Sequence, residues 1–190
     1  LGDVSGHGLG PSLIMASVRA MLHVAARTVA EPDRIVSLLA ETISPDLKQS
    51  QFISFLLVAL DPATHKVTFA NAGHAPALHY EHATGEFHRL KATRLPLGFP
   101  GINVGRVKTE FQLAPNDLMV LGTDGVVEVR DPQGNMFGEK QLQQVIESVK
   151  DRPAAGIVDV VSQTVQTFHG PLPPADDSTL VIVKRSATGH

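Results

Sequence analysis

The sequence predicts an α+β fold in which helices pack on the faces of antiparallel sheets. Apolar residues recur at helical spacing in the first 45 residues and again after Gly138. Between these regions lie short apolar or alternating runs separated by turn residues, which is the pattern of strands. The resulting order of two helices, several strands, two helices and one strand is typical of the α+β class.

The chain begins with the end of a strand at residues 1–3, followed by a tight loop over residues 5–10 that holds three glycines. A proline then suits the first turn of a helix, which we expect over residues 11–26. A second proline begins a helix over residues 32–43, and Ser44-Pro45 ends it. Each helix carries one apolar stripe.

The middle of the chain favours strands, because β-branched and aromatic residues alternate there with turn sequences such as Asp61-Pro62 and Thr84-Gly85. The expected strands are residues 52–60, 66–70, 77–80, 87–90, 107–113 and 118–121.

The last third returns to helical spacing, with apolar stripes over residues 142–149 and 157–168. Three prolines end the second stripe, and a last strand follows at residues 179–183. We therefore expect a single domain over residues 1–185 and a polar tail over residues 186–190, a length that fits one hydrophobic core.

Composition excludes several functions. The 190 residues contain no cysteine, so thiol nucleophiles, disulfides and Cys-ligated metals are excluded. The net charge of −3, with scattered Lys and Arg, argues against a nucleic-acid partner. No apolar run reaches the length of a membrane span, and the chain does not open with a signal peptide, so a cytoplasmic location is expected.

Three acidic sites stand at the ends of predicted strands: Asp3, Asp124 and the pair Asp176-Asp177. Carboxylates at strand ends are held by a rigid sheet while their oxygens stay outside the core. If folding brings them together, an all-oxygen cluster selects Mg²⁺ or Mn²⁺, and two such ions can activate a water to hydrolyse a phosphoester.

Each acidic site also has a plain structural interpretation. Asp124-Gly125 is a common turn dipeptide, and Asp176-Asp177 after three prolines is typical of a solvated loop. The loop around Asp3 is more informative, because glycines between a strand and a helix let the backbone approach an ion or a phosphate. Residue types alone leave both interpretations open.

Histidines suggest a different metal site, since five of the nine lie in the strand-rich region: His65, His74, His79, His82 and His88. Imidazoles bind zinc or copper. However, His79 and His82 stand three apart on a predicted strand and so face opposite ways, which prevents chelation by the pair. We therefore expect exposed histidines without a metal. His7, in the glycine loop, either acts near a phosphate or caps the turn.

Four stretches, in this order, resemble the bacterial SpoIIE/RsbU-type phosphatases, which belong to the metal-dependent PPM family and are similar to protein phosphatase 2C. The resemblance runs from the first residues to about Lys184. The stretches are Gly2-Asp3-Val4-Ser5-Gly6-His7-Gly8, Asn71-Ala72-Gly73-His74-Ala75-Pro76, Thr123-Asp124-Gly125-Val126 and Asp176-Asp177-Ser178-Thr179.

The resemblance implies a β-sandwich flanked by helices on both faces, in α-β-β-α layers. It also implies a metal site with two Mn²⁺ or Mg²⁺ ions, and metal-bound water as the nucleophile in place of a catalytic side chain. Asp3 would bridge both ions, the Val4 carbonyl would bind one of them, and Asp124 and Asp176 would hold the second. The secondary candidates at this site are Gly6, His7, Gly125 and Asp177, the last standing where relatives outside the subgroup usually carry Asn.

The implied reaction is hydrolysis of phosphoserine or phosphothreonine on a STAS-type anti-sigma-factor antagonist. Relatives carry further strands with a Gly-Gly-Asp segment before the Asp3 motif, whereas this chain starts at Leu1. The sequence is therefore expected to be a fragment, lacking the first strands, with weak or no activity, and a sensor domain is expected upstream.

Two other classes of function remain as alternatives. One is a catalytically inactive, phosphatase-like domain that binds a regulatory partner, against which the retained acidic residues argue. The other is a histidine-metal or sugar-binding β domain. The oligomeric state stays open, with a homodimer among the alternatives.

Overall fold

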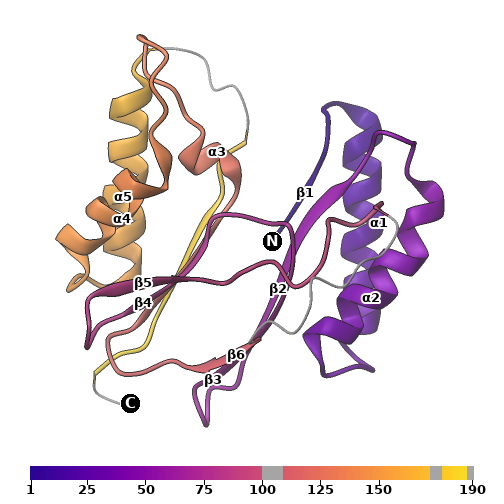
Figure 1. Cartoon of the computed structure of the whole chain (residues 1–190), viewed down its shortest axis with the longest axis horizontal. Helices are drawn as coiled ribbons and strands as arrows, with labels where there is room; N and C mark the ends of the chain where they lie inside the picture. Colours follow the sequence, from indigo (N-terminus) through magenta and orange to yellow (C-terminus); the bar gives the residue numbers. More distant parts are fainter. Residues whose placement is uncertain (100–108, 172–176, 188–190) are drawn as a thin grey trace. The chain divides into compact units, whose positions relative to one another are not determined.

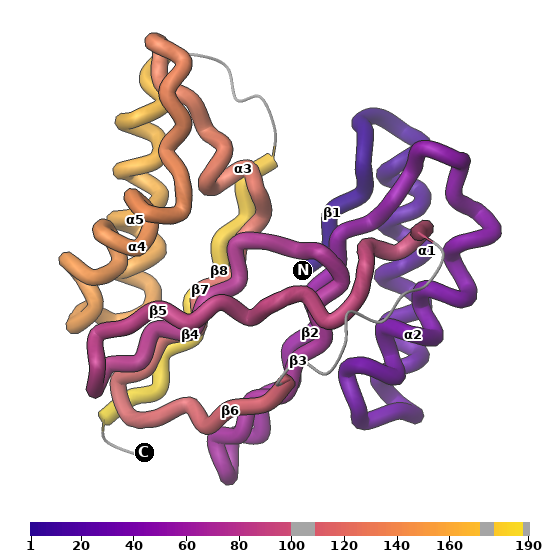
Figure 2. The backbone as a smooth tube through the Cα atoms, in the orientation of Figure 1, coloured from indigo at the N-terminus to yellow at the C-terminus, as the bar shows by residue number. Residues whose placement is uncertain are grey.

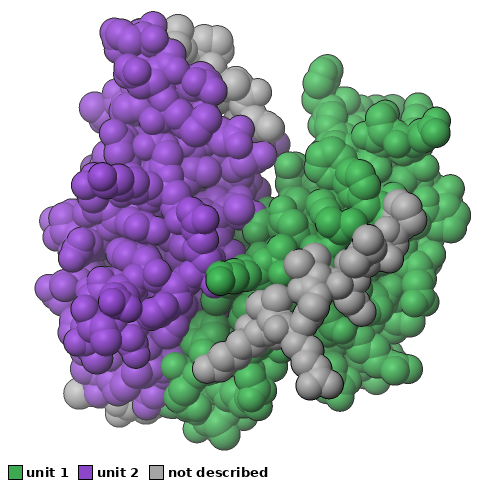
Figure 3. Space-filling view, viewed as in Figure 1, with its two compact units in different colours: residues 1–74, 90–112 green, residues 75–89, 113–190 purple. Residues whose placement is uncertain are grey.

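A computed structural model describes residues 1–99, 109–171 and 177–187 of the chain. The fold divides into two compact units (Figure 3). Unit 1 comprises residues 1–74 and 90–112, and unit 2 comprises residues 75–89 and 113–190. The chain therefore passes from one unit to the other three times, as the backbone trace lets the reader follow (Figure 2). The prediction of a single domain over residues 1–185 stays a prediction.

Unit 1 is a four-stranded antiparallel sheet with two helices on one face (Figure 1). The strand order is β1-β2-β3-β6. The helices pack on the sheet because their apolar stripes meet the apolar side chains of alternate strand residues, such as Ile53 and Phe55. The elements are β1 (Gly2–Val4), α1 (Leu9–Ala25), α2 (Pro32–Ile43), the 3₁₀ turn η1 (Ser44–Asp46), β2 (Ile53–Leu60), β3 (Lys66–Ala72) and β6 (Glu110–Gln112).

Unit 2 repeats this plan with a second antiparallel sheet, of strand order β5-β4-β7-β8 (Figure 1). Its core joins Leu78 and Val120 of the sheet to Leu142, Ile146 and Ile157 of the helices. The elements are β4 (Ala77–Glu81), β5 (Glu86–Arg89), β7 (Leu118–Gly122), α3 (Asp124–Val127), α4 (Gly138–Val149), α5 (Ala154–His169) and β8 (Leu180–Lys184).

The elements agree with the sequence prediction in type and order, and they differ at several ends. The first helix begins at Leu9 instead of Pro11, because Gly8 adopts a φ of 90° and serves as the N-cap. The strand expected over residues 107–113 is observed as Glu110–Gln112, and residues 107–108 lie outside the described part. The short helix α3 was not predicted. Residues 188–190 of the expected tail are also outside the described part.

Among the helices of the described residues, none combines the length and the apolar character that crossing a membrane requires. The longest, α1, has 17 residues.

Candidate functional site

The Asp3 motif lies in unit 1, where β1 turns into the loop before α1. The Val4 side chain is buried in the core under the two helices, and Asp3 is half-buried. Two hydrogen bonds anchor the loop: the Ser5 N–H donates to the Phe52 carbonyl at 2.9 Å, and the Phe52 N–H donates to Ser5 Oγ at 3.0 Å. These contacts hold the Asp3-Val4 segment at the end of a strand, as the sequence predicts.

Asp124 lies in unit 2 at the first position of α3, and Thr123 alone separates it from the end of β7. Thr123 is the N-cap of this helix, and the Gly125 N–H donates to Asp124 Oδ1 at 2.9 Å. Asp124 is half-buried, so its carboxylate is held at the end of a buried strand without being sealed in the core. The sequence pattern had allowed a plain turn here, whereas the structure shows a helix start.

The segment before β8 lies against the Asp124 loop. Gly122 of β7 pairs with Leu180 of β8, and beyond this pair the Thr123 N–H donates to the Thr179 carbonyl at 3.0 Å. The Thr123 hydroxyl accepts from the Thr179 N–H at 3.0 Å and donates to the Asp177 carbonyl at 3.3 Å. Thr123 therefore joins two predicted acidic sites that are far apart in the sequence.

The contact between the Asp124 loop and the Asp177 segment requires a glycine at position 125. A Cβ atom at position 125 would lie 2.3 Å from the Asp177 carbonyl oxygen and 3.0 Å from its carbon. Because these are backbone atoms, a side chain could be accommodated only by moving one of the two segments. The glycine of the Asp124-Gly125 pair thus serves a close approach of two chain segments.

The predicted site residues are distributed over both units. Unit 1 holds Asp3 and Val4. It also holds Gly6 and His7, which are exposed in the loop between β1 and α1. Unit 2 holds Asp124, Gly125 and the exposed Asp177, which the fold brings to one end of the β7–β8 pair. Asp176 lies outside the described residues. Within residues 1–99, 109–171 and 177–187, no three His, Asp or Glu side chains form a metal-ligating group.

Sequence reasoning missed a polar cluster in unit 1 at the end of β3. Asn71 is 2% exposed, and its amide joins the turn that follows: the Asn71 Oδ1 accepts from the His74 N–H at 2.8 Å, and Nδ2 donates to the carbonyls of His74 and Leu90 at 3.0 and 2.7 Å. His74 Nδ1 lies 2.8 Å from Ser54 Oγ. The Asn-Ala-Gly-His motif was the available signal, although its contacts were not predictable.

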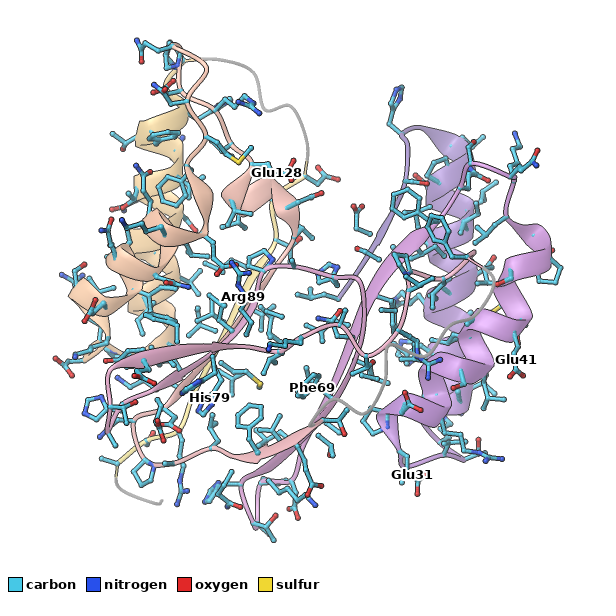
Figure 4. All side chains as sticks on the ribbon, viewed as in Figure 1. Glu31, Glu41, Phe69, His79, Arg89 and Glu128 are labelled. Carbon is cyan, nitrogen blue, oxygen red and sulfur yellow. The ribbon has the colours of Figure 1, made fainter. Side chains whose placement is uncertain are left out.

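The prediction of exposed histidines is wrong for His74 and His79, which are both buried. His79 is labelled in Figure 4. Its Nε2 lies 2.8 Å from Asp117 Oδ2, and the Asp117 carboxylate also accepts from the N–H groups of His82 and Ala114 at 2.9 Å each. A buried polar side chain requires such partners. These two histidines are thus parts of hydrogen-bonded networks inside their units.

The donor set fits a hard divalent cation. The candidate ligands are carboxylates and one main-chain carbonyl, and oxygen donors select Mg²⁺ or Mn²⁺ over softer metals. The close approach at Gly125 brings the main chain of the Asp124 and Asp177 segments together within unit 2. The chemistry of the residues present is therefore consistent with the metal centre that the resemblance implies.

Comparison with solved structures shows that the fold is that of the PP2C-type phosphatases. The SiaA-PP2C domain of Pseudomonas aeruginosa superposes with a TM-score of 0.79 at 23% identity, covering 97% of this chain and 72% of that one. RsbX, whose structure was determined in complex with magnesium, superposes with a TM-score of 0.66 at 15% identity, covering 97% of this chain and 79% of that one.

The chain belongs to the Stage II sporulation protein E (SpoIIE) family, which it matches over residues 1–186. It is 23% identical to the phosphoserine phosphatase RsbP of Bacillus subtilis over 186 residues, or 95% of this chain and 44% of RsbP. The chain spans less than half the length of the curated relatives it matches.

Proposed function

We propose that this chain is a Mn²⁺- or Mg²⁺-dependent protein serine/threonine phosphatase. Membership of the SpoIIE family and the PP2C-type fold supply the phosphatase class. The observation that carries the proposal for this chain is the joining of the Asp124 loop to the Asp177 segment through Thr123 and Gly125. Such a contact keeps the main chain of two aspartate-bearing segments, distant in the sequence, at one strand end, and a metal centre with oxygen ligands requires segments to be brought together in this way.

In this proposal Asp3, the Val4 carbonyl, Asp124 and Asp176 would hold two divalent ions, with Asp3 serving both. The ions, when bound, lower the pKa of a water molecule and neutralise charge on the phosphoryl group. The protein's contribution is orientation. The Ser5 hydrogen bonds hold the Asp3 loop, and the Gly125 N–H fixes one oxygen of Asp124.

The substrate we propose is phosphoserine or phosphothreonine on a regulatory protein, specifically a STAS-type anti-sigma-factor antagonist. The likeness to RsbP, a phosphoserine phosphatase, supports the phosphoserine class. The magnesium in RsbX supports the choice of a hard divalent ion. We also propose a cytoplasmic location and control by a sensor domain.

The test is hydrolysis of a phosphoserine STAS protein by the full-length protein in Mn²⁺, compared with an Asp124→Ala variant. Removing a metal ligand should lower hydrolysis by more than the roughly 10–100-fold that loss of an outer-shell partner produces. Mn²⁺ affinity, measured by isothermal titration calorimetry, should fall in parallel.

Asp159→Ala is the matched control, because it removes an exposed carboxylate from α5 in the same unit. This variant should hydrolyse the substrate and bind Mn²⁺ as the unaltered protein does. Unchanged hydrolysis and metal affinity in Asp124→Ala would refute the metal assignment. Binding of the STAS protein without phosphate release and without metal dependence would instead establish a catalytically inactive, partner-binding domain.

A further inference from the structure

The helix-free face of the unit 1 sheet carries a row of polar side chains. In the antiparallel register Asp3 pairs with Ser54 and Leu56 pairs with Asn71. Alternate residues of these strands, including Val4 and Ile53, belong to the core under α1 and α2. Because side chains alternate along a strand, Asp3, Ser54 and Asn71 therefore share the opposite face.

Ser54 is the direct cross-strand neighbour of Asp3. Side chains at paired positions of antiparallel strands have their Cβ atoms about 4.5–5.5 Å apart, so a serine hydroxyl is within reach of an aspartate carboxylate. On its other side Ser54 Oγ lies 2.8 Å from Nδ1 of His74. Ser54 thus stands between the carboxylate proposed to bridge the two ions and a buried imidazole.

The position of His74 is set by Asn71. The Asn71 side chain accepts from the His74 N–H and donates to the His74 carbonyl, so it clamps the main chain on both sides of the imidazole. The Asn71 N–H donates to Thr93 Oγ1 at 3.0 Å, and Thr93 Oγ1 donates back to the Asn71 carbonyl at 3.1 Å. With His74 only 4% exposed, its ring has little freedom to turn away from Ser54.

A serine hydroxyl has one proton, and the direction in which His74 uses Ser54 decides where that proton points. If Ser54 donates to Nδ1, no proton is left for a second acceptor. If Nδ1 carries the hydrogen and donates to Oγ, the Ser54 proton is available to a carboxylate. The tautomer of His74 therefore determines whether the Ser54 hydroxyl can donate a hydrogen bond to the Asp3 carboxylate.

We propose that Ser54 and His74 are positioning residues for Asp3. In this chain of hydrogen bonds, Nδ1–H of His74 donates to Ser54 Oγ, and the Ser54 hydroxyl donates to a carboxylate oxygen of Asp3, which fixes the orientation of that carboxylate for its metal ions. The role of Asp3 as a ligand rests on the proposed function. The contact between His74 and Ser54 and the pairing of Asp3 with Ser54 are independent of the proposed function.

The first experiment reads the tautomer without metal. Nitrogen-15 NMR of the ¹⁵N-histidine-labelled, metal-free protein should show a proton on Nδ1 of His74, with the resonance assigned by its loss in His74→Gln. A Nδ1 without a proton would mean that Ser54 donates to the imidazole, and this outcome would overturn the proposal whether or not the protein proves to be a phosphatase.

The second experiment measures Mn²⁺ affinity by calorimetry. Ser54→Ala should weaken binding by about 10–100-fold, as loss of an outer-shell partner does, whereas Ser54→Thr retains the hydroxyl and should bind as the unaltered protein does. His74→Asn places an amide N–H near the site of Nδ1, so this variant should retain the Mn²⁺ affinity of the unaltered protein. His74→Gln does not, and it should weaken Mn²⁺ binding as much as Ser54→Ala does. Ser37→Ala, which removes an exposed hydroxyl from α2, is the control.

Equal Mn²⁺ affinity in Ser54→Ala and the unaltered protein would overturn the positioning role. If Ser54→Ala fails to fold, the contrast between His74→Asn and His74→Gln decides the question, and equal affinity of these two would overturn it. An Asp3→Asn variant separates the two proposals, since unchanged Mn²⁺ binding in this variant contradicts the metal assignment itself.

Discussion

The two units have the same plan, a four-stranded antiparallel sheet with a pair of long helices, yet they support their candidate ligands differently. In unit 2 the Asp124 loop is held by the Thr123 hydroxyl, which bonds to the main chain of Thr179 and Asp177, and by the close approach at Gly125. In unit 1 the end of the sheet around Asp3 carries a polar cluster built from the buried Asn71 and His74 and the half-buried Ser54. The support in unit 2 requires that position 125 has no side chain, in addition to the Thr123 hydroxyl, whereas the support in unit 1 consists of hydrogen bonds that involve side chains.

This difference shows that similar architecture does not fix how a site is stabilised. A glycine contact fails when volume is added, whereas a buried polar network fails when a partner is removed. The two kinds of support therefore predict different responses to substitution, and each prediction below is a way to separate them.

The largest effect on stability is expected for Asn71→Ala. The change leaves the buried His74 N–H and Leu90 carbonyl without the partner that Asn71 supplies. Because each of these two buried groups costs about 1–3 kcal/mol when it loses its hydrogen bond, the free energy of unfolding should fall by about 2–6 kcal/mol, measured by urea denaturation.

Asn135→Ala is the matched control, because it removes an exposed asparagine amide that contacts Asp131 on the surface of unit 2. Its effect should stay near the ±0.5 kcal/mol typical of surface changes. Equal losses of stability in the two variants would show that the Asn71 cluster is not a main support of unit 1.

A smaller loss of stability is expected for Gly125→Ala in unit 2. The added Cβ would overlap the Asp177 carbonyl, and overpacking of this kind costs about 1–3 kcal/mol. Since one segment must move, Mn²⁺ affinity should fall together with stability.

Gly156→Ala provides the comparison within the same unit. This glycine lies inside α5, where a Cβ would meet only Arg152 side-chain atoms at 3.6 Å and beyond. The exchange should raise stability by up to about 1 kcal/mol, because alanine favours a helix interior. A Gly125→Ala variant as stable and as metal-competent as Gly156→Ala would contradict the close-approach interpretation.

The smallest effect on stability is expected from acid titration of exposed turns, since each unit has a turn of the same kind. Hydrogen bonds from the Thr64 side chain and the Ala63 N–H lower the pKa of Asp61 in unit 1, and hydrogen bonds led by the Asn135 side chain lower the pKa of Asp131 in unit 2. With the pKa lower in the folded state, these bonds stabilise the turns above the ordinary aspartate value of 3.8 and are lost as the pH falls through the folded-state pKa.

Amide chemical shifts followed during acid titration should therefore report loosening of both turns in the same acidic range. The amides of Ala63 and Asn135 are the reporters, since both donate to the carboxylates concerned. A transition near neutral pH in either turn would contradict this account.

Much of the fold was predictable because local patterns decide it. The apolar stripes of α2, α4 and α5 and the apolar run of β2 predict element type without knowledge of their neighbours. Element ends were less predictable, since they depend on caps such as Gly8 and Thr123 that compete with equally suitable residues nearby. The helix α3 was missed because four residues are too few to show a period.

The site was predictable only in part. Asp3 and Asp124 could be singled out, because carboxylates at strand ends next to glycines are a recognisable pattern. The joining of Asp124 to Asp177 through Thr123 could not be derived from residue types, since it depends on β7 pairing with β8. The burial of His79 was likewise not predictable, because alternation along a strand does not tell which face is covered. His74 lies in the turn after β3, where its burial accompanies hydrogen bonds from Asn71 that the sequence does not show.

The sequence by itself determined the class of fold, the lack of cysteine in these 190 residues and, by resemblance, the SpoIIE family. Only the tertiary structure decided that Gly125 is needed for a contact with Asp177, and that Asn71, His74 and Ser54 form a cluster on the sheet that carries Asp3. The physical reason is one of range. Periodicity and turn chemistry act over a few residues, whereas close approaches and buried hydrogen bonds join residues that only the folded chain brings together.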